Sequence, residues 1–318
     1  MSQGRHRCSY TKGDPRALPP CECCACDSRF SSDFASPSRA LISLPSAPAQ
    51  ANSGKLSANQ AAQSVSPQPI GPLKTWAVQK SEEPAITVVL SPHSDDACFS
   101  LGHMLQSSPG AVLLNLYTST DFTATGRIHP DDASRLRRAE DSVFASRLGL
   151  RLEDLALPEA LMRGHHPFDL RGIERDASEL DQVLFPRLAD IGAAAGLDRV
   201  DLFCPLGVGG HRDHVATLMV VVENLPALSE HFRVCFYEDL PYASSAVNRE
   251  AAAARLKAWL APRQVARQIL ALDDKQFANK LELARLYRSQ ISALSETAHL
   301  IPADSHAPAP HEAWWTQD

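Results

Sequence analysis

The stretch AITVVLSPHSDDA, residues 85–97, decides how this sequence folds. Residues 85–90 are apolar and rich in β-branched side chains, and Pro84 precedes them, which predicts a short buried parallel strand. The polar run 91–96 therefore leaves the carboxyl end of that strand, where open α/β sheets bind their ligands. This run holds one histidine and two aspartates within four positions. The sequence thus predicts a divalent-metal site at this edge of the sheet.

A second cluster of the same kind follows a later strand. The segment VDLFCPL, residues 200–206, predicts another buried strand, and the glycine loop 207–210 connects it to His211-Arg-Asp-His214. These two histidines are three residues apart, so both side chains can face the same side of a first helical turn. Both clusters follow the carboxyl ends of strands in the same sheet. We therefore expect them to form one composite metal site.

Strands and helices alternate along the rest of the chain. Further strands are predicted at 110–117, 152–157 and 233–238. Helices are predicted at 96–108, 130–150, 172–195, 214–225, 248–261 and 274–294. Strands separated by helices of this length indicate βαβ units. We therefore predict an α/β protein with a three-layer Rossmann-like fold and a mostly parallel sheet.

The composition divides the chain into three parts. Residues 27–72 are poor in large apolar groups and rich in Ser, Ala, Pro and Gln, so they cannot offset their ordering entropy. We predict a disordered, low-complexity tail at 1–80, a catalytic domain at 81–302 and a C-terminal tail at 303–318.

Five of the eight cysteines lie in the first 26 residues, with CECCAC at 21–26 as the dense part. Cys21-x-x-Cys24 and Cys23-x-x-Cys26 have the spacing of metal ligands, for zinc or copper. No partner pair of Cys or His follows at zinc-finger distance. We interpret the cluster as part of a solvated tail, or as translation from an upstream start codon.

Charge and hydropathy argue against nucleic acid as the main partner and against a membrane-spanning segment. The 318-residue chain has a net charge of −6 and no basic stretch of five residues, which argues against nucleic acid. It has no run of 18 apolar residues that could cross a membrane, and its N-terminus lacks the apolar core of a signal peptide. We therefore expect a cytoplasmic protein with a small-molecule substrate.

The first cluster has the composition of a catalytic zinc site. His93 and Asp96 can converge on one ion, and with one further histidine they complete a set of three protein ligands that leaves a position for water. Asp95, beside that water, is then the candidate general base. The alternative is that Asp95 and Asp96 only cap the next helix, where acids are favoured. Capping explains neither the histidine nor the second cluster.

The second cluster supplies the remaining groups. One of His211 and His214 can complete the ligand set, while the other donates a proton or a hydrogen bond to the reacting carbonyl. Asp213 between them can orient an imidazole, as carboxylates behind metal ligands do. The alternative is a surface helix start with incidental histidines.

Together, His93-Ser-Asp-Asp96 and His211-Arg-Asp-His214 make the chain resemble the zinc-dependent de-N-acetylases of the LmbE-like, or PIG-L, family. The resemblance covers roughly residues 84–300 and implies the LmbE-like deacetylase fold. Many relatives have Glu after the aspartate pair, where this chain has Ala97, which we interpret as a subgroup mark. Further matching segments are RRAEDSVFASRLGL (137–150), LGVGGHRDH (206–214), FYEDLPYA (236–243) and KLELARLYRSQ (280–290).

The resemblance implies a role for each motif residue. Asp95 is the implied general base, His211 is the implied acid or oxyanion-stabilising residue, and Asp213 is implied to support His211. The implied zinc ligands are His93, Asp96 and His214. Another divalent metal is an alternative to zinc.

Three further residues are candidates for substrate binding. Arg137 corresponds in relatives to an arginine near the sugar hydroxyls, with a solvent-facing helix charge as the alternative. Glu238 and Tyr242, together with Asp239, follow the end of strand 233–238 and so reach the same rim of the sheet. They either shape the pocket or cap a turn.

The resemblance implies a metal-dependent hydrolase that removes the N-acetyl group of an N-acetylglucosamine-type sugar conjugate or a related metabolite. One alternative is a Rossmann-like nucleotide or cofactor binder, although the first strand is not followed by the glycine-rich loop that such proteins use. Another is a catalytically silent family member that acts as a binding module.

Overall fold

The computed structural model describes residues 86–196, 200–291, 300–304, 307–308 and 310–317. All of them belong to the compact unit Ile70–Asp318. The predicted tail 1–80, with its cysteine cluster, lies outside the described residues.

Seven strands of the described chain form one sheet, in the order β5-β2-β1-β6-β7-β9-β8. The strands are β1 (Ile86–Ser91), β2 (Val112–Ser119), β5 (Arg151–Pro158), β6 (Val200–Pro205), β7 (Phe232–Tyr237), β8 (Val265–Ala271) and β9 (His311–Gln317). The pairs from β5 to β7 are parallel, and β9 is antiparallel to both of its neighbours. A short hairpin of β3 (Phe122–Thr123) and β4 (Gly126–Arg127) follows β2. The predicted α/β fold with a mostly parallel sheet is confirmed.

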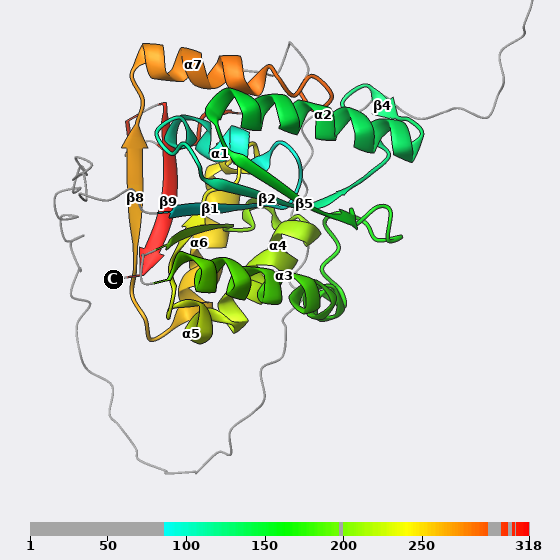
Figure 1. Cartoon of the computed structure of the whole chain (residues 1–318). Coiled ribbons are helices and arrows are strands. Elements are labelled where there is room, and N and C mark those ends of the chain that lie inside the picture. Colours follow the sequence, from blue (N-terminus) through cyan, green and yellow to red (C-terminus); the bar gives the residue numbers. More distant parts are fainter. Residues whose placement is uncertain (1–85, 197–199, 292–299, 305–306, 309, 318) are drawn as a thin grey trace, which may run out of the picture. The chain divides into compact units, whose positions relative to one another are not determined.

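Helices cover both faces of this sheet. They are α1 (Asp96–Leu105), α2 (Pro130–Leu148), α3 (Ile173–Ala195), α4 (Arg212–Glu223), α5 (Leu225–Leu228), α6 (Ala246–Leu260) and α7 (Asp274–Ala284). Helices α1, α2 and α7 lie on one face, and α3, α4 and α5 lie on the other (Figure 1). The architecture is therefore three-layered, as predicted.

The strand order places β1 at the point where the chain reverses its direction across the sheet. From β1 the chain proceeds through β2 to the edge strand β5, then returns to β6 on the other side of β1. Open α/β sheets bind their ligands in the crevice beside the carboxyl ends of the strands at such a switch point. Both polar motifs of the sequence follow these two strands, β1 and β6.

The core makes this position rigid. Val88, Val89 and Leu90 of β1 are completely buried, as predicted for a strand covered on both faces. On α3, Leu180, Leu184 and Leu188 recur every four residues and are buried against the sheet.

The C-terminal segment differs from the prediction. Residues 303–318 were expected to be a tail, but 311–317 form β9 between β7 and β8. Glu312 of β9 is fully buried, where it pairs with Lys280 and accepts the backbone N–H groups of His103 and Met104. These contacts between distant residues hold strand β9 in the sheet, and the local sequence pattern does not predict them.

The last predicted helix, 274–294, ends at Ala284 in the structure. The following turn directs Tyr287 into the core, where its hydroxyl donates to Asp141. Ser289 donates to Glu140 through both its backbone and its hydroxyl group. These buried hydrogen bonds to α2 replace the helical ones, so the helix stops without a glycine or proline.

Among the described residues, the helices are too short or too polar for any of them to cross a bilayer.

Candidate metal centre and active site

The turn after β1 positions the first motif. The Ser91 hydroxyl donates to the carbonyl of His93 and accepts the backbone N–H of Ala97, at 2.6 and 3.1 Å. Asp96 Oδ2 accepts the backbone N–H of His93 at 2.7 Å. Asp95 occupies the N-cap position of α1, yet its side chain makes no capping hydrogen bond. The alternative that the aspartate pair only caps the helix is therefore wrong for Asp95.

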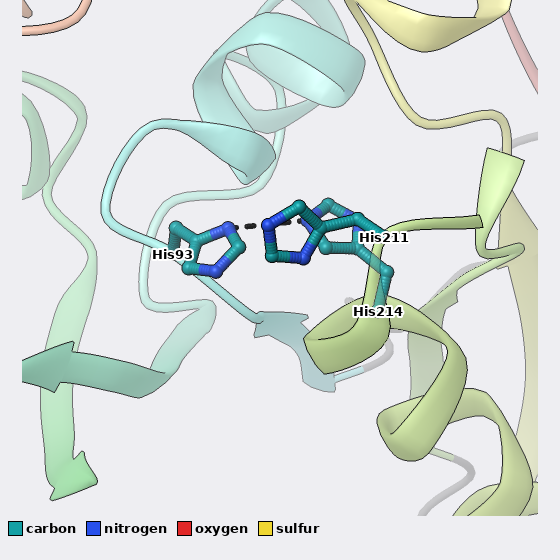
Figure 2. Close-up of side chains that lie close together, drawn as sticks. All are labelled: His93, His211 and His214. Carbon is teal, nitrogen blue, oxygen red and sulfur yellow. Dashed lines mark hydrogen bonds between the residues drawn. The ribbon is translucent and has the colours of Figure 1, made fainter. Parts of the chain in front are cut away.

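The second motif starts helix α4 after a tight glycine loop. Gly209 has a φ of +78°, and atoms of Tyr242 lie 2.8–2.9 Å from where a Cβ would stand. A side chain there would be both strained and blocked, so this position requires glycine. The loop brings His211 and His214 towards His93 from the neighbouring strand, as Figure 2 shows.

Three side-chain atoms of the two motifs form a nearly equilateral triangle. His93 Nδ1 lies 3.2 Å from His214 Nε2, and Asp96 Oδ2 lies 3.3 and 3.2 Å from these two nitrogens. Ligands bound at about 2.0–2.1 Å to a tetrahedral ion stand about 3.3–3.4 Å apart. The donor set and its spacing therefore fit a divalent cation with two imidazoles and one carboxylate.

Each of the two imidazoles has a carboxylate behind it. Asp213 Oδ2 lies 3.0 Å from His93 Nε2, and Asp239 Oδ1 lies 2.6 Å from His214 Nδ1. Such a carboxylate accepts the N–H of one ring nitrogen and leaves the lone pair of the other for a metal. Here both lone pairs point into the triangle.

Two findings in this arrangement differ from the sequence-based assignment. Asp213 contacts the ring of His93, whereas it was expected to support His211. Asp239, directly after Glu238 at the end of β7, was expected to shape the pocket or cap a turn, and its contact with His214 was not predicted. The signal that could have identified it is a carboxylate at the end of the strand next to β6.

The electrostatics favour positive charge at the triangle. Burial lowers the pKa of His93, but hydrogen bonds to Asp213 and Asp96 outweigh it, and the net pKa is well above its ordinary value. Burial also opposes the charge on His214, yet Asp96 and Asp239 raise its pKa to about 9. The two histidines in turn lower the pKa of Asp96, against the effect of burial. A cation bound here would replace the proton that these groups otherwise attract.

Asp95 lies beside the triangle and is not part of it. Burial and the charge of Asp96 raise its pKa to about 6, while Arg137 opposes the shift. A carboxylate with a pKa near neutrality can accept a proton and release it again, as a general base requires.

Arg137 is not the solvent-facing helix charge of the alternative, and its contact with the sugar hydroxyls stays a prediction. It is only 2% exposed, and its guanidinium lies 3.3 Å from Asp95 Oδ1 and 2.6 Å from Glu159 Oε1. Thr120 donates to the other oxygen of Glu159. The arginine is thus held in place and fixes the orientation of Asp95.

His211 lies next to the triangle in the neutral form. Burial, together with the nearby charges of His93 and His214, lowers its pKa well below the ordinary value. Its Nδ1 accepts the backbone N–H of Asp213 at 3.3 Å, which leaves the proton of the neutral ring on Nε2. One ring nitrogen from each of the three histidines lies within 4.8 Å of the other two. His211 can therefore donate a hydrogen bond into the site, as an oxyanion-stabilising residue would, whereas the protonated ring that an acid requires is disfavoured.

The two remaining candidates for substrate binding, Tyr242 and Glu238, lie in different surroundings. Tyr242 lies at the site, with its ring edge-on to His214 at a centroid distance of 5.7 Å. Glu238 is buried away from it, in a two-pronged ion pair with Arg267 and a hydrogen bond from Trp315 Nε1. Its predicted role in the pocket is wrong, because its carboxylate is bound by Arg267 of β8 and Trp315 of β9. Neither of these strands was predicted from the sequence.

The chain is similar to deacetylases both in sequence and in fold. The chain is 29% identical over 168 residues to the 2'-N-acetylparomamine deacetylase of Streptomyces fradiae, a match that spans 49% of this chain and 57% of the relative. No family model matches the sequence.

Solved structures with this fold include a pseudoaglycone deacetylase and the zinc-inhibited form of teicoplanin deacetylase. Each has a TM-score of 0.50, at 18% and 17% identity, and the match covers 74% of this chain and 98% and 99% of theirs. The resemblance to LmbE-like, or PIG-L, deacetylases is thereby confirmed at the level of the fold.

Proposed function

We propose that this chain, which has the fold of the LmbE-like deacetylases, is a metal-dependent hydrolase that removes an N-acetyl group from an amino-sugar conjugate or a related metabolite. The observation that carries the proposal is the triangle of His93, Asp96 and His214, with the ionisable Asp95 beside it. The sequence relative is named for removing an acetyl group from an N-acetylated compound, which supports the same reaction class.

His93, Asp96 and His214 would hold the ion, and Asp213 and Asp239 would keep the two rings oriented. Two nitrogens and one carboxylate oxygen are a ligand set that suits zinc, with iron or another divalent ion as alternatives. Such an ion, when bound, makes water more acidic and polarises a carbonyl group.

The chain's other residues then carry the proton transfers. Asp95 takes a proton from the attacking water, and Arg137 holds the carboxylate in position. His211 donates a hydrogen bond from Nε2 to the amide oxygen as negative charge develops on it. The protonated Asp95 returns its proton to the departing nitrogen, the C–N bond breaks, and acetate and a free amine leave.

The alternative of a nucleotide binder without hydrolysis gains no support from the site. The turn between β1 and helix α1, residues 92–95, contains no glycine, so the glycine-rich turn that admits a phosphate is missing there.

The test is acetate release from a panel of N-acetylated glycosides and metabolites, before and after loading with zinc. We expect metal-dependent release from at least one amino-sugar substrate. A protein that binds zinc at the motif histidines, yet releases acetate from none of them, would contradict the proposal.

A further inference from the structure

A half-exposed phenyl ring stands directly beside the catalytic histidine. Phe168 lies on the loop between β5 and α3, and its side chain is 51% exposed. Its ring is edge-on to His211 at a centroid distance of 5.6 Å and to Tyr242 at 6.2 Å. A single exposed apolar side chain is ordinary on a protein surface. This general observation does not explain why the ring of Phe168 contacts two residues of the site.

The loop that carries Phe168 is anchored on both sides of the ring. The backbone N–H of Arg212 donates to the carbonyl of Pro167, and its guanidinium donates to the carbonyls of Asp169 and Arg171. Arg212 is itself 1% exposed and paired with Asp176 at the start of α3. The backbone on both sides of Phe168 is therefore held in place.

The anchor links the ring to the catalytic motif. Arg212 lies between His211 and Asp213 in the sequence, so the residue that fixes the loop also starts helix α4. Arg163, from the same loop, pairs with both Asp213 and Asp176. Phe168 consequently has a fixed position relative to the hydrogen-bond donor of His211.

We propose that Phe168 forms the apolar wall of the substrate subsite and packs against the C–H face of the sugar ring whose acetamido group meets His211. This inference rests on the proposed function, and it makes a pyranose ring the part of the substrate that this residue recognises. A sugar ring presents C–H groups on its faces and hydroxyls at its rim, so an aromatic ring takes the face while polar groups serve the rim. Ligand pockets commonly combine aromatic walls with a few polar groups in this way.

The experiment compares two substrates that differ in the ring. Methyl N-acetylglucosaminide has a pyranose, whereas N-acetylethanolamine has the same amide without one. For Phe168→Ala we expect KM for the glycoside to rise about tenfold, as for a lost contact of about 1.4 kcal/mol. Its kcat should stay within about twofold, and the parameters for N-acetylethanolamine should not change. Phe168→Trp should retain the low KM for the glycoside.

Val143→Ala is the matched control, since Val143 is an apolar residue of α2 that is 53% exposed, close to the exposure of Phe168. Zinc content and melting temperature should be equal in all variants. An unchanged KM of Phe168→Ala for the glycoside, or an equal loss on both substrates, would overturn the inference while the proposed function stands.

Wild-type protein that releases acetate from neither substrate calls for a binding measurement. Calorimetry should then show that the zinc-loaded Asp95→Asn protein binds methyl N-acetylglucosaminide. Adding Phe168→Ala to that variant should weaken the binding about tenfold. Equal binding by both proteins, or no binding by either, would overturn the inference. The failure of the proposed function itself is read separately, from acetate release across the full substrate panel.

Discussion

Two adjacent aspartates acquire different chemistry from their surroundings. Asp96 is shared by His93 and His214, which hold its pKa low, whereas Asp95 has a raised pKa of about 6 and faces Arg137. The first arrangement suits a metal ligand that stays ionised, and the second suits a base that takes up and returns a proton.

Replacing Asp95 by Asn should therefore stop turnover without releasing the ion. Loss of a general base costs about 10²–10⁴-fold in rate, so we expect kcat for acetate release to fall by about that factor. Zinc stoichiometry should stay equal to that of Asp131→Asn, a control at a side chain that is 89% exposed. Retained turnover at unchanged zinc content would remove Asp95 from the role of base.

Asp239 should matter for metal affinity, since it fixes the ring of His214. Loss of a carboxylate behind a metal-binding histidine costs about 10–100-fold in affinity. Asp239→Asn should weaken zinc binding by that factor in a competition titration with a chelator. An affinity equal to that of Asp131→Asn would show that the carboxylate does not support the ligand.

The elements divide into those with a local signal and those without one. The strand ending at Ser91 and the helix starting at Pro130 could be predicted because apolar periodicity and an N-terminal proline mark them. Strand β9 and the early end of α7 could not, because a buried ion pair and buried hydrogen bonds between distant residues determine them.

The site divides in the same way. The motif residues His93, Asp96 and His214 meet as the strand order requires, since β1 and β6 are neighbours. The partners of Asp213, Arg137 and Glu238 could not be derived from the sequence, because each of these side chains has several charged groups within reach. Only the packed structure selects among them.

The turn after α7 can be tested through one hydroxyl group. Tyr287→Phe removes the hydrogen bond to the buried Asp141 and leaves that carboxylate with one partner fewer. Loss of a partner for a buried polar group costs about 1–3 kcal/mol. We expect the free energy of unfolding, measured with urea, to fall by that amount.

Ser142→Ala is the control, since its hydroxyl is exposed and donates only to the backbone of Arg138. Equal stabilities for Tyr287→Phe and Ser142→Ala would contradict the role given to the buried bond.

At the scale of the whole molecule, the ion would connect the two halves of the sheet. Its ligands follow β1 and β6, on either side of the point where the chain reverses direction. An ion that binds only the folded chain stabilises it by about 2.7 kcal/mol when its free concentration is about 100 times Kd.

Removal of the metal with a chelator should therefore lower the melting temperature of the wild type by several degrees. Added zinc should restore it. His214→Ala should show neither effect, because one of the three ligands is missing. A chelator effect of equal size in that variant would place the stabilising ion elsewhere.

Equilibrium dialysis of the zinc-loaded wild type against His214→Ala tests the metal triangle most directly. We predict one zinc ion per wild-type chain that the variant no longer retains. Equal retention of zinc by both proteins, at equal affinity, would contradict the assignment of the ion to His93, Asp96 and His214.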